Sequence, residues 1–296
     1  MLRLIKNMDI RFMAIRKIPI FLSSLLIVIS ILSFVLKGFN FGIDFSSGYI
    51  VQLKFDEQVS IVNIENKFSE SNIDDVTVQL YGSSKDVLIK LKDEEIFKKN
   101  NINNFINDMF SDKSFTISKL EYVGAQVGSE LREKGEWAML IALFSILIYV
   151  ALRFEIIYGL GAITALVHDV IITLGVFSIF DLTFDLSVLA AILAVIGYSL
   201  NDSIVVFDRI RENNIILRKL SILDVLDKSI NQTLSRTLVT SLTTLFVIIS
   251  LLIFGGDAVR NFSIAMFIGI IVGTYSSIFV ASTSLSYFGI QRPEEN

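Results

Sequence analysis

The sequence predicts a multi-pass α-helical membrane protein with six transmembrane helices and one α+β domain outside the membrane. The 296 residues are 53% hydrophobic and only 19% charged, so the chain is more apolar than an ordinary soluble protein. Several stretches approach or exceed the roughly 18–20 apolar residues that span a bilayer. The segment 38–136, in contrast, is strongly charged and alternates between strand and helix patterns.

The first apolar span covers residues 18–37 and follows a basic N-terminal segment, 1–17. A secretory signal peptide has the same charged start. The apolar core here is longer than that of a signal peptide, and no small-x-small cleavage motif follows it. We therefore expect a retained transmembrane helix.

Residues 38–136 are predicted to form the domain outside the membrane. Alternating residues indicate strands and apolar residues at helical spacing indicate helices, with a hairpin turn at Gly82–Lys85. The order is strand 49–55, helix 59–71, strands 76–81 and 86–91, helix 93–110 and strand 115–123. This β-α-β-β-α-β order predicts the split βαβ, or ferredoxin-like, arrangement.

Residues 137–288 contain five further apolar spans, and 289–296 form a short C-terminal segment. The spans cover about 137–153, 156–180, 185–207, 237–254 and 262–288. With the N-terminus inside, thirteen Lys and Arg residues fall on the inner side and one, Arg260, in the short outer loops. By the positive-inside rule, both termini are expected in the cytoplasm.

The composition excludes several classes of function. The chain has no cysteine, which excludes disulfides, thiolate metal sites and cysteine nucleophiles. It has one histidine, which excludes multi-histidine metal sites. No basic patch indicates nucleic acid, and no phosphate-binding loop or nucleophile elbow indicates an enzyme. We expect neither catalysis nor a bound cofactor.

Acidic residues inside the apolar spans are the candidate functional groups. A carboxylate at the bilayer centre costs at least ~2.5–3.5 kcal/mol, so it is rarely kept there without a role. Asp202 falls about five residues from the inner end of its span, or ~8 Å at 1.5 Å per residue. Arg236 opens the next span, so the two residues can lie at similar depth on neighbouring helices. The spacing is that of a buried ion pair.

Such a pair could act as a proton switch. Burial disfavours the charged carboxylate whereas a nearby guanidinium favours it, so a helix movement that separates them would drive proton uptake. Tyr198, Ser199 and Asn201 offer hydrogen-bonding groups close by in the sequence. Further hydroxyls that could hold water are those of Ser203, Thr237, Thr240, Ser241, Thr243 and Thr244. The spacing leaves open a second interpretation, in which Asp202 is solvated at the inner interface with Asp208 and Arg209.

Asp169 lies near the middle of its span, with His168 beside it. A solvated position is harder to sustain at that depth. The two side chains could titrate together, or they could hydrogen-bond other helices in a structural role. Both interpretations stay open on the sequence.

Four motifs resemble one family in order along the chain: "FNFGIDFSSG", "HDVIITLG", "VIGYSLNDSIVVFDRIREN" and "LSRTLVTSLTTL". They resemble the SecD/SecF family of bacterial protein-export membrane proteins, relatives of the resistance-nodulation-division transporters. The short outer segment, 38–136, is similar to that of the smaller, SecF, branch. The chain departs from the family pattern at Ser47 and Tyr49, where a glycine and a threonine are usual, so a residue with less backbone freedom stands at 47.

The resemblance implies an accessory subunit that works with SecD beside the SecYEG channel in the bacterial cytoplasmic (inner) membrane. It implies YajC and a YidC-type insertase as further partners and an unfolded preprotein as substrate. The proton motive force, or a sodium gradient, would drive the last stage of export. By the same resemblance, Asp202 and Arg236 match the proton-carrying aspartate and the essential arginine, and Asp169 matches an HD motif.

Two other functions compete with this interpretation. A proton-driven exporter of small molecules or lipids would need a substrate cleft and usually a second six-span half, which this chain lacks. A purely structural partner of SecD would tolerate neutral residues at Asp202, Arg236 and Asp169. Loss of proton-dependent export in Asp202→Asn would separate the relay from the structural role.

Overall fold

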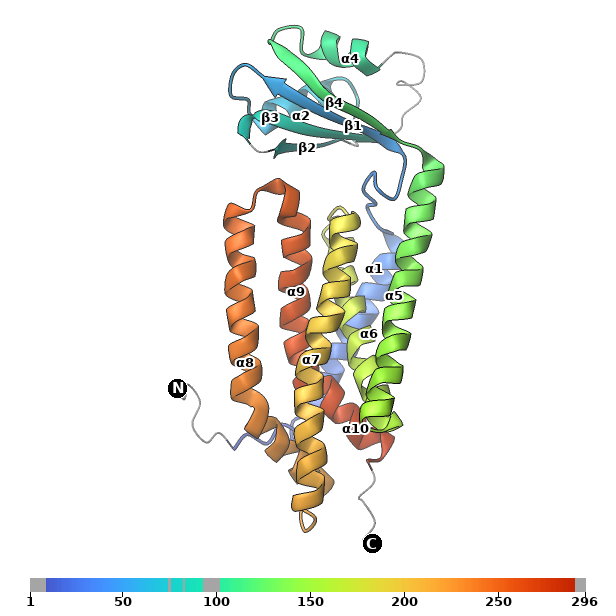
Figure 1. Ribbon diagram of the computed structural model, residues 1–296, viewed down its shortest axis with the longest axis vertical. Coiled ribbons are helices and arrows are strands. Elements are labelled where there is room, and N and C mark those ends of the chain that lie inside the picture. The colour runs from blue at the N-terminus through green and yellow to red at the C-terminus, as the bar shows by residue number, and fades with distance from the viewer. Residues whose placement is uncertain (1–8, 74–75, 82, 93–101, 291–296) are drawn as a thin grey trace.

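The computed structural model describes residues 9–73, 76–81, 83–92 and 102–290 of the chain. A bundle of long helices carries a four-stranded sheet over one end (Figure 1). Helix α1 begins and helix α10 ends at the opposite end of the bundle, which we call the distal end (Figure 1). The sheet and the distal end therefore lie on opposite sides of the apolar bundle.

Six helical stretches of the described chain are long and apolar enough to cross a membrane. This confirms the predicted multi-pass α-helical architecture. The last span, Asp257–Phe288, is built from four consecutive pieces: the 3-10 helix η1 (Asp257–Val259), a long α-helix, a short π-helix and a final α-helix. The helices are α1 (Lys17–Leu36), α5 (Ala125–Arg153), α6 (Ile156–Ile179), α7 (Leu186–Ile216), α8 (Ile222–Phe254), α9 (Arg260–Ser276), η2 (Ser277–Ala281) and α10 (Ser282–Phe288).

Three helices continue beyond the apolar spans that the sequence marks. Helix α5 begins at Ala125 rather than near 137, α7 runs on to Ile216, and α8 already begins at Ile222. Hydropathy marks only the part of a helix that fits the bilayer, whereas backbone hydrogen bonding continues into water. At its start α8 is capped by the Ser221 side chain, which accepts a hydrogen bond from the Asp224 backbone N–H at 3.2 Å. Arg236 therefore lies well inside α8.

The sheet has the strand order β2-β3-β1-β4, with antiparallel neighbours throughout. Strand β3 thus lies between β1 and β2, which makes the sheet compatible with the predicted ferredoxin-like arrangement. The elements are β1 (Gly48–Phe55), α2 (Ile61–Glu70), β2 (Val76–Tyr81), β3 (Ser83–Lys92), α4 (Ile102–Met109) and β4 (Phe115–Val123).

Two local predictions in this domain concern the turn between β2 and β3 and the helix before β4. The hairpin turn predicted at Gly82–Lys85 is wrong over 83–85, because β3 begins at Ser83 and Ser83 already pairs with Tyr81. Gly82 itself lies outside the described residues. The polar composition of 83–85 indicated a loop, but the extended backbone of β3 includes them, and its pairing with β2 shifts register between Leu80 and Tyr81. The helix predicted over 93–110 is described only from Ile102, since residues 93–101 lie outside the described part of the chain.

One face of the sheet carries the domain's core. Val51, Leu53 and Phe55 alternate along β1 and are buried against Phe68 of α2 and Ile106 of α4. The other face looks toward the helix ends across a polar cavity, lined by β2 and β3 residues and by Asp181, Thr183, Asp185 and Asn261. The domain is therefore a layer of helices on a sheet, with its polar side toward the bundle.

Two covalent connections join the domain to the bundle. Residues 37–47 link α1 to β1, and within them Gly42 N–H donates to the Phe184 carbonyl at 2.9 Å while Phe184 N–H donates to the Asn40 carbonyl at 2.8 Å. Helix α5 starts directly after β4, and its Gly128 lies so close to Ser46 that an added Cβ would meet the Ser46 carbonyl oxygen at 2.4 Å. The joint is closely packed.

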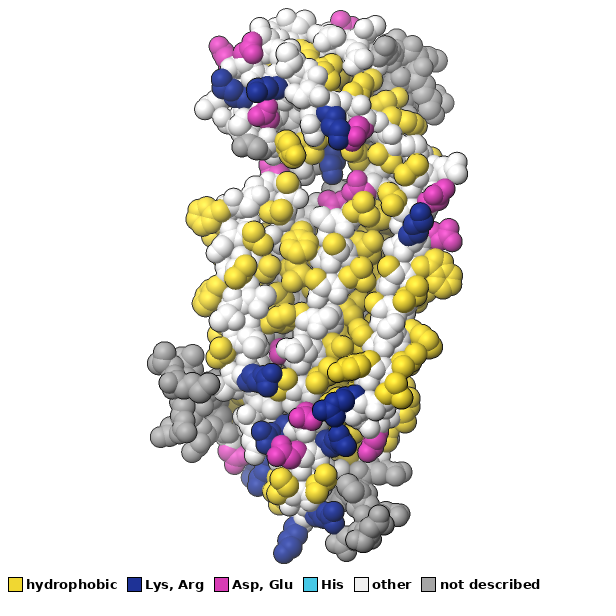
Figure 2. Space-filling model, viewed as in Figure 1, with side chains coloured by type: hydrophobic (Ala, Val, Ile, Leu, Met, Phe, Trp, Pro, Cys, Tyr) yellow, Lys and Arg dark blue, Asp and Glu magenta, His cyan; other side chains and the backbone are white. Residues whose placement is uncertain are grey.

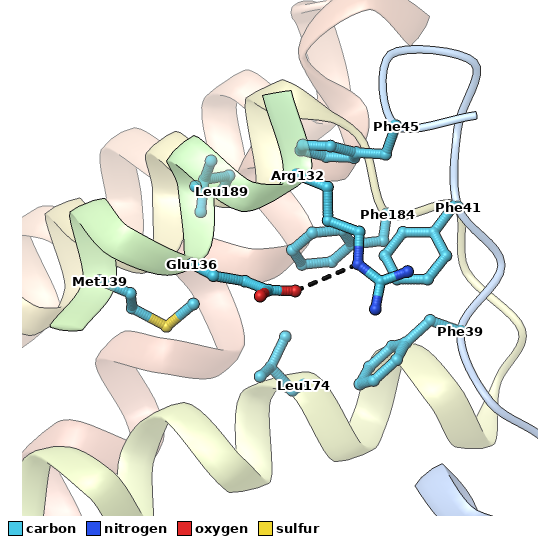
Figure 3. Close-up of a pocket in the computed structure, with 10 residues that line it drawn as sticks. Phe39, Phe41, Phe45, Arg132, Glu136, Met139, Leu174, Phe184 and Leu189 are labelled. Atoms are coloured by element: carbon cyan, nitrogen blue, oxygen red, sulfur yellow. Dashed lines mark hydrogen bonds and ion pairs between the residues drawn. The ribbon is translucent and has the colours of Figure 1, made fainter. Parts of the chain in front are cut away.

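An apolar pocket of about 180 Å³ lies at this joint (Figure 3). The rings of Phe39, Phe41 and Phe45 line it from the α1–β1 connection, and Phe184 lines it from the segment before α7. The Arg132 guanidinium of α5 lies 4.9 Å from the centre of the Phe41 ring, a cation–π contact. Its Nε also donates to Glu136 at 3.1 Å, so this charge is satisfied within its own helix.

The departure from the family pattern at Ser47 and Tyr49 has a structural account. Asn72 and Asp181 are the non-glycine residues with positive φ in the described chain, so Ser47 has negative φ and needs no glycine. Gly48 is different, because a Cβ there would meet the Leu91 carbonyl oxygen at 2.3 Å. Tyr49 forms a cross-strand aromatic pair with Tyr122, with ring centres 4.8 Å apart.

Candidate functional site

Asp202 lies on the face of α7 that packs against α8. Its side chain is only 3% exposed. Thr240 and Ser241 of α8 donate to its two carboxylate oxygens over 3.4 and 3.5 Å. Both distances are longer than the usual O–H···O hydrogen bond of about 2.5–3.0 Å, so the carboxylate is buried but loosely held. The interpretation of Asp202 as a solvated interfacial acid is therefore wrong for this structure.

Arg236 does not form the predicted buried ion pair with Asp202. Within the described chain, no ion pair of 4.0 Å or less joins the two residues, and Arg236 is exposed. The reason is the rotation of α8, which turns Thr237 and Ser241 toward α7 and leaves Arg236 on the flank of that face. Its charge still acts through space on the Asp202 carboxylate.

Arg236 lines a polar cavity of about 370 Å³ near the distal end of the bundle. Asn201 lines the same cavity, so this residue faces Arg236 rather than Asp202. Arg209 and Glu212 of α7 form an ion pair of 2.9 Å at the same cavity. Basic and acidic side chains gather around this end of the bundle, below the apolar band (Figure 2).

Apart from Thr240 and Ser241, the hydroxyls predicted around Asp202 differ in whether they have a hydrogen-bond partner. Ser203 and Thr237 are buried without a hydrogen-bond partner in the described chain, so they are the groups that a water molecule would satisfy. Thr243 and Thr244 bond backbone carbonyls of their own helix. Tyr198 has a buried hydroxyl without a partner among the described residues and makes no hydrogen bond to Asp202.

Asp169 is the centre of a second, tighter cluster. It is 1% exposed, and its Oδ2 accepts from Ser199 of α7 at 2.6 Å and from Ser276 of α9 at 2.8 Å. Its Oδ1 lies 2.8 Å from Nδ1 of His168. Ser199 was predicted to lie beside Asp202, but it donates its hydrogen bond to Asp169. Neighbours in sequence on α7 face different acids because successive residues of a helix point about 100° apart.

The His168 ring continues this cluster toward α1. Its Nε2 lies 3.1 Å from the Ser23 hydroxyl of α1, and that hydroxyl lies 3.1 Å from the hydroxyl of Tyr275. Ser23, Tyr275 and Ser276 were missed by the sequence analysis. The polar run Thr274–Ser277 inside an apolar span is the signal that could have revealed them.

A single contact brings the two acids into one polar region. The Ser241 hydroxyl lies 3.5 Å from an Asp202 carboxylate oxygen and 2.7 Å from the hydroxyl of Thr274 on α9. Ser276, which donates to Asp169, follows two residues later on the same helix. No group of three or more potential metal ligands exists in the part of the chain that the structure describes. The arrangement suits uptake and release of a small cation such as a proton.

Comparison with known proteins decides the family. Residues 102–291 match the family described as protein export membrane protein SecD/SecF, C-terminal, and residues 32–59 match the SecD/SecF GG motif. A protein translocase subunit SecF from Pseudomonas aeruginosa is 44% identical over 97% of this chain and 94% of its own length. The chain belongs to the SecF family. A SecF from Calditerrivibrio nitroreducens is 48% identical over 95% of both chains.

A solved structure shows the same fold. The crystal structure of SecDF, a translocon-associated membrane protein from Thermus thermophilus, superposes with a TM-score of 0.79 at 38% identity. The match covers 93% of this chain but only 38% of the SecDF chain, which is much longer. As a SecF-family protein, this chain is a multi-pass protein of the bacterial membrane and a protein-translocase subunit. The comparisons thus favour export of proteins over export of small molecules or lipids.

Proposed function

We propose that this SecF-family protein works with SecD as an accessory subunit of the Sec translocase and uses the proton motive force to complete preprotein export. Both termini would lie in the cytoplasm, which places the sheet on the outer side of the membrane. SecYEG, YajC and a YidC-type insertase would be neighbours in the assembly, and an unfolded preprotein the substrate. Its role is mechanical rather than enzymatic.

The observation that carries the proposal is the state of Asp202. A carboxylate that is 3% exposed and receives only two long hydroxyl bonds is poorly compensated as an anion. It is therefore suited to hold a proton while Arg236 stays away in the distal cavity. When the guanidinium approaches, the charged carboxylate becomes favourable and the proton is released.

The movement needed for this cycle is small. The Thr240 hydroxyl lies 3.4 Å from an Asp202 carboxylate oxygen and 3.1 Å from the backbone carbonyl oxygen of Arg236. A rotation or slide of α8 against α7 would therefore move the arginine and the carboxylate relative to each other at once. Such shifts of packed helices by about 1–2 Å are a common switching device.

The outer domain is covalently connected to two helices of the bundle, so a movement of the bundle can reach it. Its sheet is connected to α1 through residues 37–47 and to α5 through Gly124. A change in the bundle would thus reorient the domain, which would bind emerging preprotein and release it on the outer side. Proton or sodium ion can serve as the coupling ion, since one carboxylate with hydroxyl neighbours suits either.

The test is Asp202→Asn in membrane vesicles that contain the chain together with SecD and SecYEG. Asparagine keeps the shape and removes the titrating group, so the part of export that a proton gradient drives should be lost. Asp208→Asn is the matched control, because Asp208 lies on the same helix at the solvated distal cavity. Undiminished gradient-driven export in Asp202→Asn would overturn the relay.

A further inference from the structure

A second buried cluster, centred on His168 and Asp169, lies apart from the Asp202 relay. Five hydrogen-bonding side chains from α1, α6, α7 and α9 meet there. They are Ser23, His168, Asp169, Ser199 and Ser276, with Tyr275 completing the chain on the α1 side. Each contact needs one hydrogen, so the hydrogens can be counted.

The count starts at the α1 side. The hydroxyl of Tyr275 donates its only hydrogen to the Pro19 carbonyl at 2.7 Å. The 3.1 Å contact between Tyr275 and Ser23 must therefore use the hydrogen of Ser23. With that hydrogen spent, Ser23 can only accept from His168, so Nε2 of the imidazole carries a hydrogen.

The count ends at the carboxylate. The 2.8 Å contact between His168 Nδ1 and Asp169 Oδ1 needs one more hydrogen, carried by either atom. The hydroxyls of Ser199 and Ser276 point at the other oxygen, Oδ2, and do not supply it. The pair therefore holds two hydrogens, one more than a neutral imidazole beside an ionised carboxylate. Its net charge is zero, as its burial favours.

We infer that the His168–Asp169 pair is a second proton-binding site of this protein, and that its extra proton fastens α1 to α9 through the Ser23–Tyr275 hydrogen bond. This deepens the proposed function, because it adds a place where proton occupancy acts on the helix that leads into the outer domain. Asp202, on α7, is a further buried acid of the described helices. The neighbouring elements present hydroxyls to the pair, of Ser23, Tyr275, Ser199 and Ser276, among the described contacts.

Release of the proton changes the contacts in a defined way. The proton leaves the pair for a water molecule, and the pair keeps one hydrogen and one negative charge. If that hydrogen stays between Nδ1 and Oδ1, Nε2 is bare and Ser23 must turn its hydrogen toward it. The oxygens of Ser23 and Tyr275 then face each other without a hydrogen, so α1 loses a hydrogen bond to α9.

A cavity of about 490 Å³ gives the released proton a path. It runs between α1, α6 and α10 on the distal half of the bundle, and His168 and Ser23 line it. Hydroxyls of Ser24 and Thr283 also line it, and the Thr283 hydroxyl is buried without a partner in the described chain. Most of the lining is apolar, and the unpartnered Thr283 hydroxyl is the buried polar group there that a water molecule would satisfy.

The outer half of α1 carries the effect toward the domain. Ser33 lies 2.7 Å from Ser178 of α6, whose hydroxyl also donates to the Gly38 carbonyl just after α1. Ser30 packs directly on Gly175 of α6. Loosening α1 at Ser23 would therefore weaken one end of a continuous serine-lined contact that ends at the connection to β1.

The single histidine of the chain makes the test direct. The full-length protein is labelled with ¹⁵N-histidine and combined with unlabelled SecD in lipid nanodiscs. All imidazole signals in its NMR spectrum then come from His168. At neutral pH we expect hydrogen on Nε2, and at higher pH one titration step that changes the Nε2 signal. A bare Nε2 with hydrogen on Nδ1 at neutral pH would overturn the inference.

Asp169→Asn supplies the matched variant. The asparagine amide can donate to Nδ1 permanently, so the Nε2 hydrogen should persist and the titration step should vanish. A disulfide between positions 33 and 178, introduced by Ser33→Cys together with Ser178→Cys, reports on α1, because the native chain has no cysteine. The rate at which this disulfide forms is compared with its rate in the same double variant that also carries Asp169→Asn. As pH rises, the first rate should fall several-fold relative to the second. Equal rates in both backgrounds would contradict the fastening role.

Asp202→Asn separates this inference from the proposed function. It should leave the His168 titration unchanged while abolishing gradient-driven export. If His168 lacks the extra proton but Asp202→Asn stops export, only the second site is wrong. If His168 titrates as described but export survives Asp202→Asn, the second site stands and the Asp202 relay is wrong.

Discussion

The hydroxyl oxygens of Ser241 and Thr274 lie 2.7 Å apart, and this contact ties α8 to α9 beside the buried carboxylate of Asp202. Ser241 thereby touches both the acid of the relay and the helix that holds Asp169 through Ser276. In the proposed cycle, the two acids are separate proton-binding groups that share one polar region. Changes at Ser241 are the most direct way to perturb their relation.

Ser241→Ala removes both of these contacts. We expect a loss of about 1 kcal/mol of unfolding free energy, since one intramolecular hydrogen bond typically contributes that much. Gradient-driven export should also fall, because Asp202 loses one of its two hydroxyl partners. Ser250→Ala is the control, as that exposed hydroxyl bonds only its own helix at Phe246. Equal export by the two variants would contradict the role of Ser241.

Arg236→Gln separates function from stability. Arg236 is exposed and makes no ion pair with Asp202 in the described chain, so its removal should change the unfolding free energy by less than about 1 kcal/mol. Gradient-driven export should nevertheless be lost, because no cation remains to drive the proton off Asp202. Thermal unfolding and export are measured on the same membranes. A strongly lowered unfolding temperature would show that Arg236 is structural.

Gly175→Ala tests the close contact between α1 and α6. An added Cβ would lie 2.0 Å from the Ser30 hydroxyl oxygen, so the helices must move apart. Overpacking of this kind typically costs about 1–3 kcal/mol. Gly197→Ala is the matched control, because a Cβ at that helical position meets nothing within 4 Å. Unfolding temperatures measured in detergent should fall for Gly175→Ala and hold or rise for Gly197→Ala.

Gly128→Ala tests the joint between the domain and the bundle. The added Cβ would lie 2.4 Å from the Ser46 carbonyl oxygen, a backbone atom that cannot turn aside. We expect faster proteolysis of the segment 37–47 and a several-fold loss of export. Gly124→Ala, where the Cβ meets only the Tyr122 ring at 3.7 Å, should behave as the native chain. Matching digestion patterns for the two variants would argue against a fixed joint.

Asp112 of the outer domain is an acid whose titration should affect the stability of the domain. A hydrogen bond from Lys67 holds the pKa of Asp112 below its ordinary value of 3.8. Because the folded pKa is depressed, the contribution is present above that ordinary value and is lost as pH falls through the folded pKa. Asp112→Asn should therefore flatten the acid side of the domain's unfolding curve. Asp108→Asn, at an exposed neighbouring position, should leave the curve unchanged.

The sequence predicted the membrane architecture because its signals are local. Hydropathy marks the spans of α1 and α6 closely, and the alternation in 49–55 marks β1 to within a residue. It failed where context overrides composition. Polar residues 83–85 joined a strand, and α5 continued well past the apolar part of its helix.

The sequence by itself determined the number of spans, the split α+β domain and the presence of Asp202, Asp169 and Arg236 inside or beside apolar stretches. Only the tertiary structure decided which groups these residues face: Ser199 serves Asp169, Asn201 faces the cavity of Arg236, and Ser23 of α1 completes the His168 cluster. The physical reason is that hydropathy fixes whether a helix is buried in lipid. Its rotation and its neighbours are set by packing against helices far away in the chain.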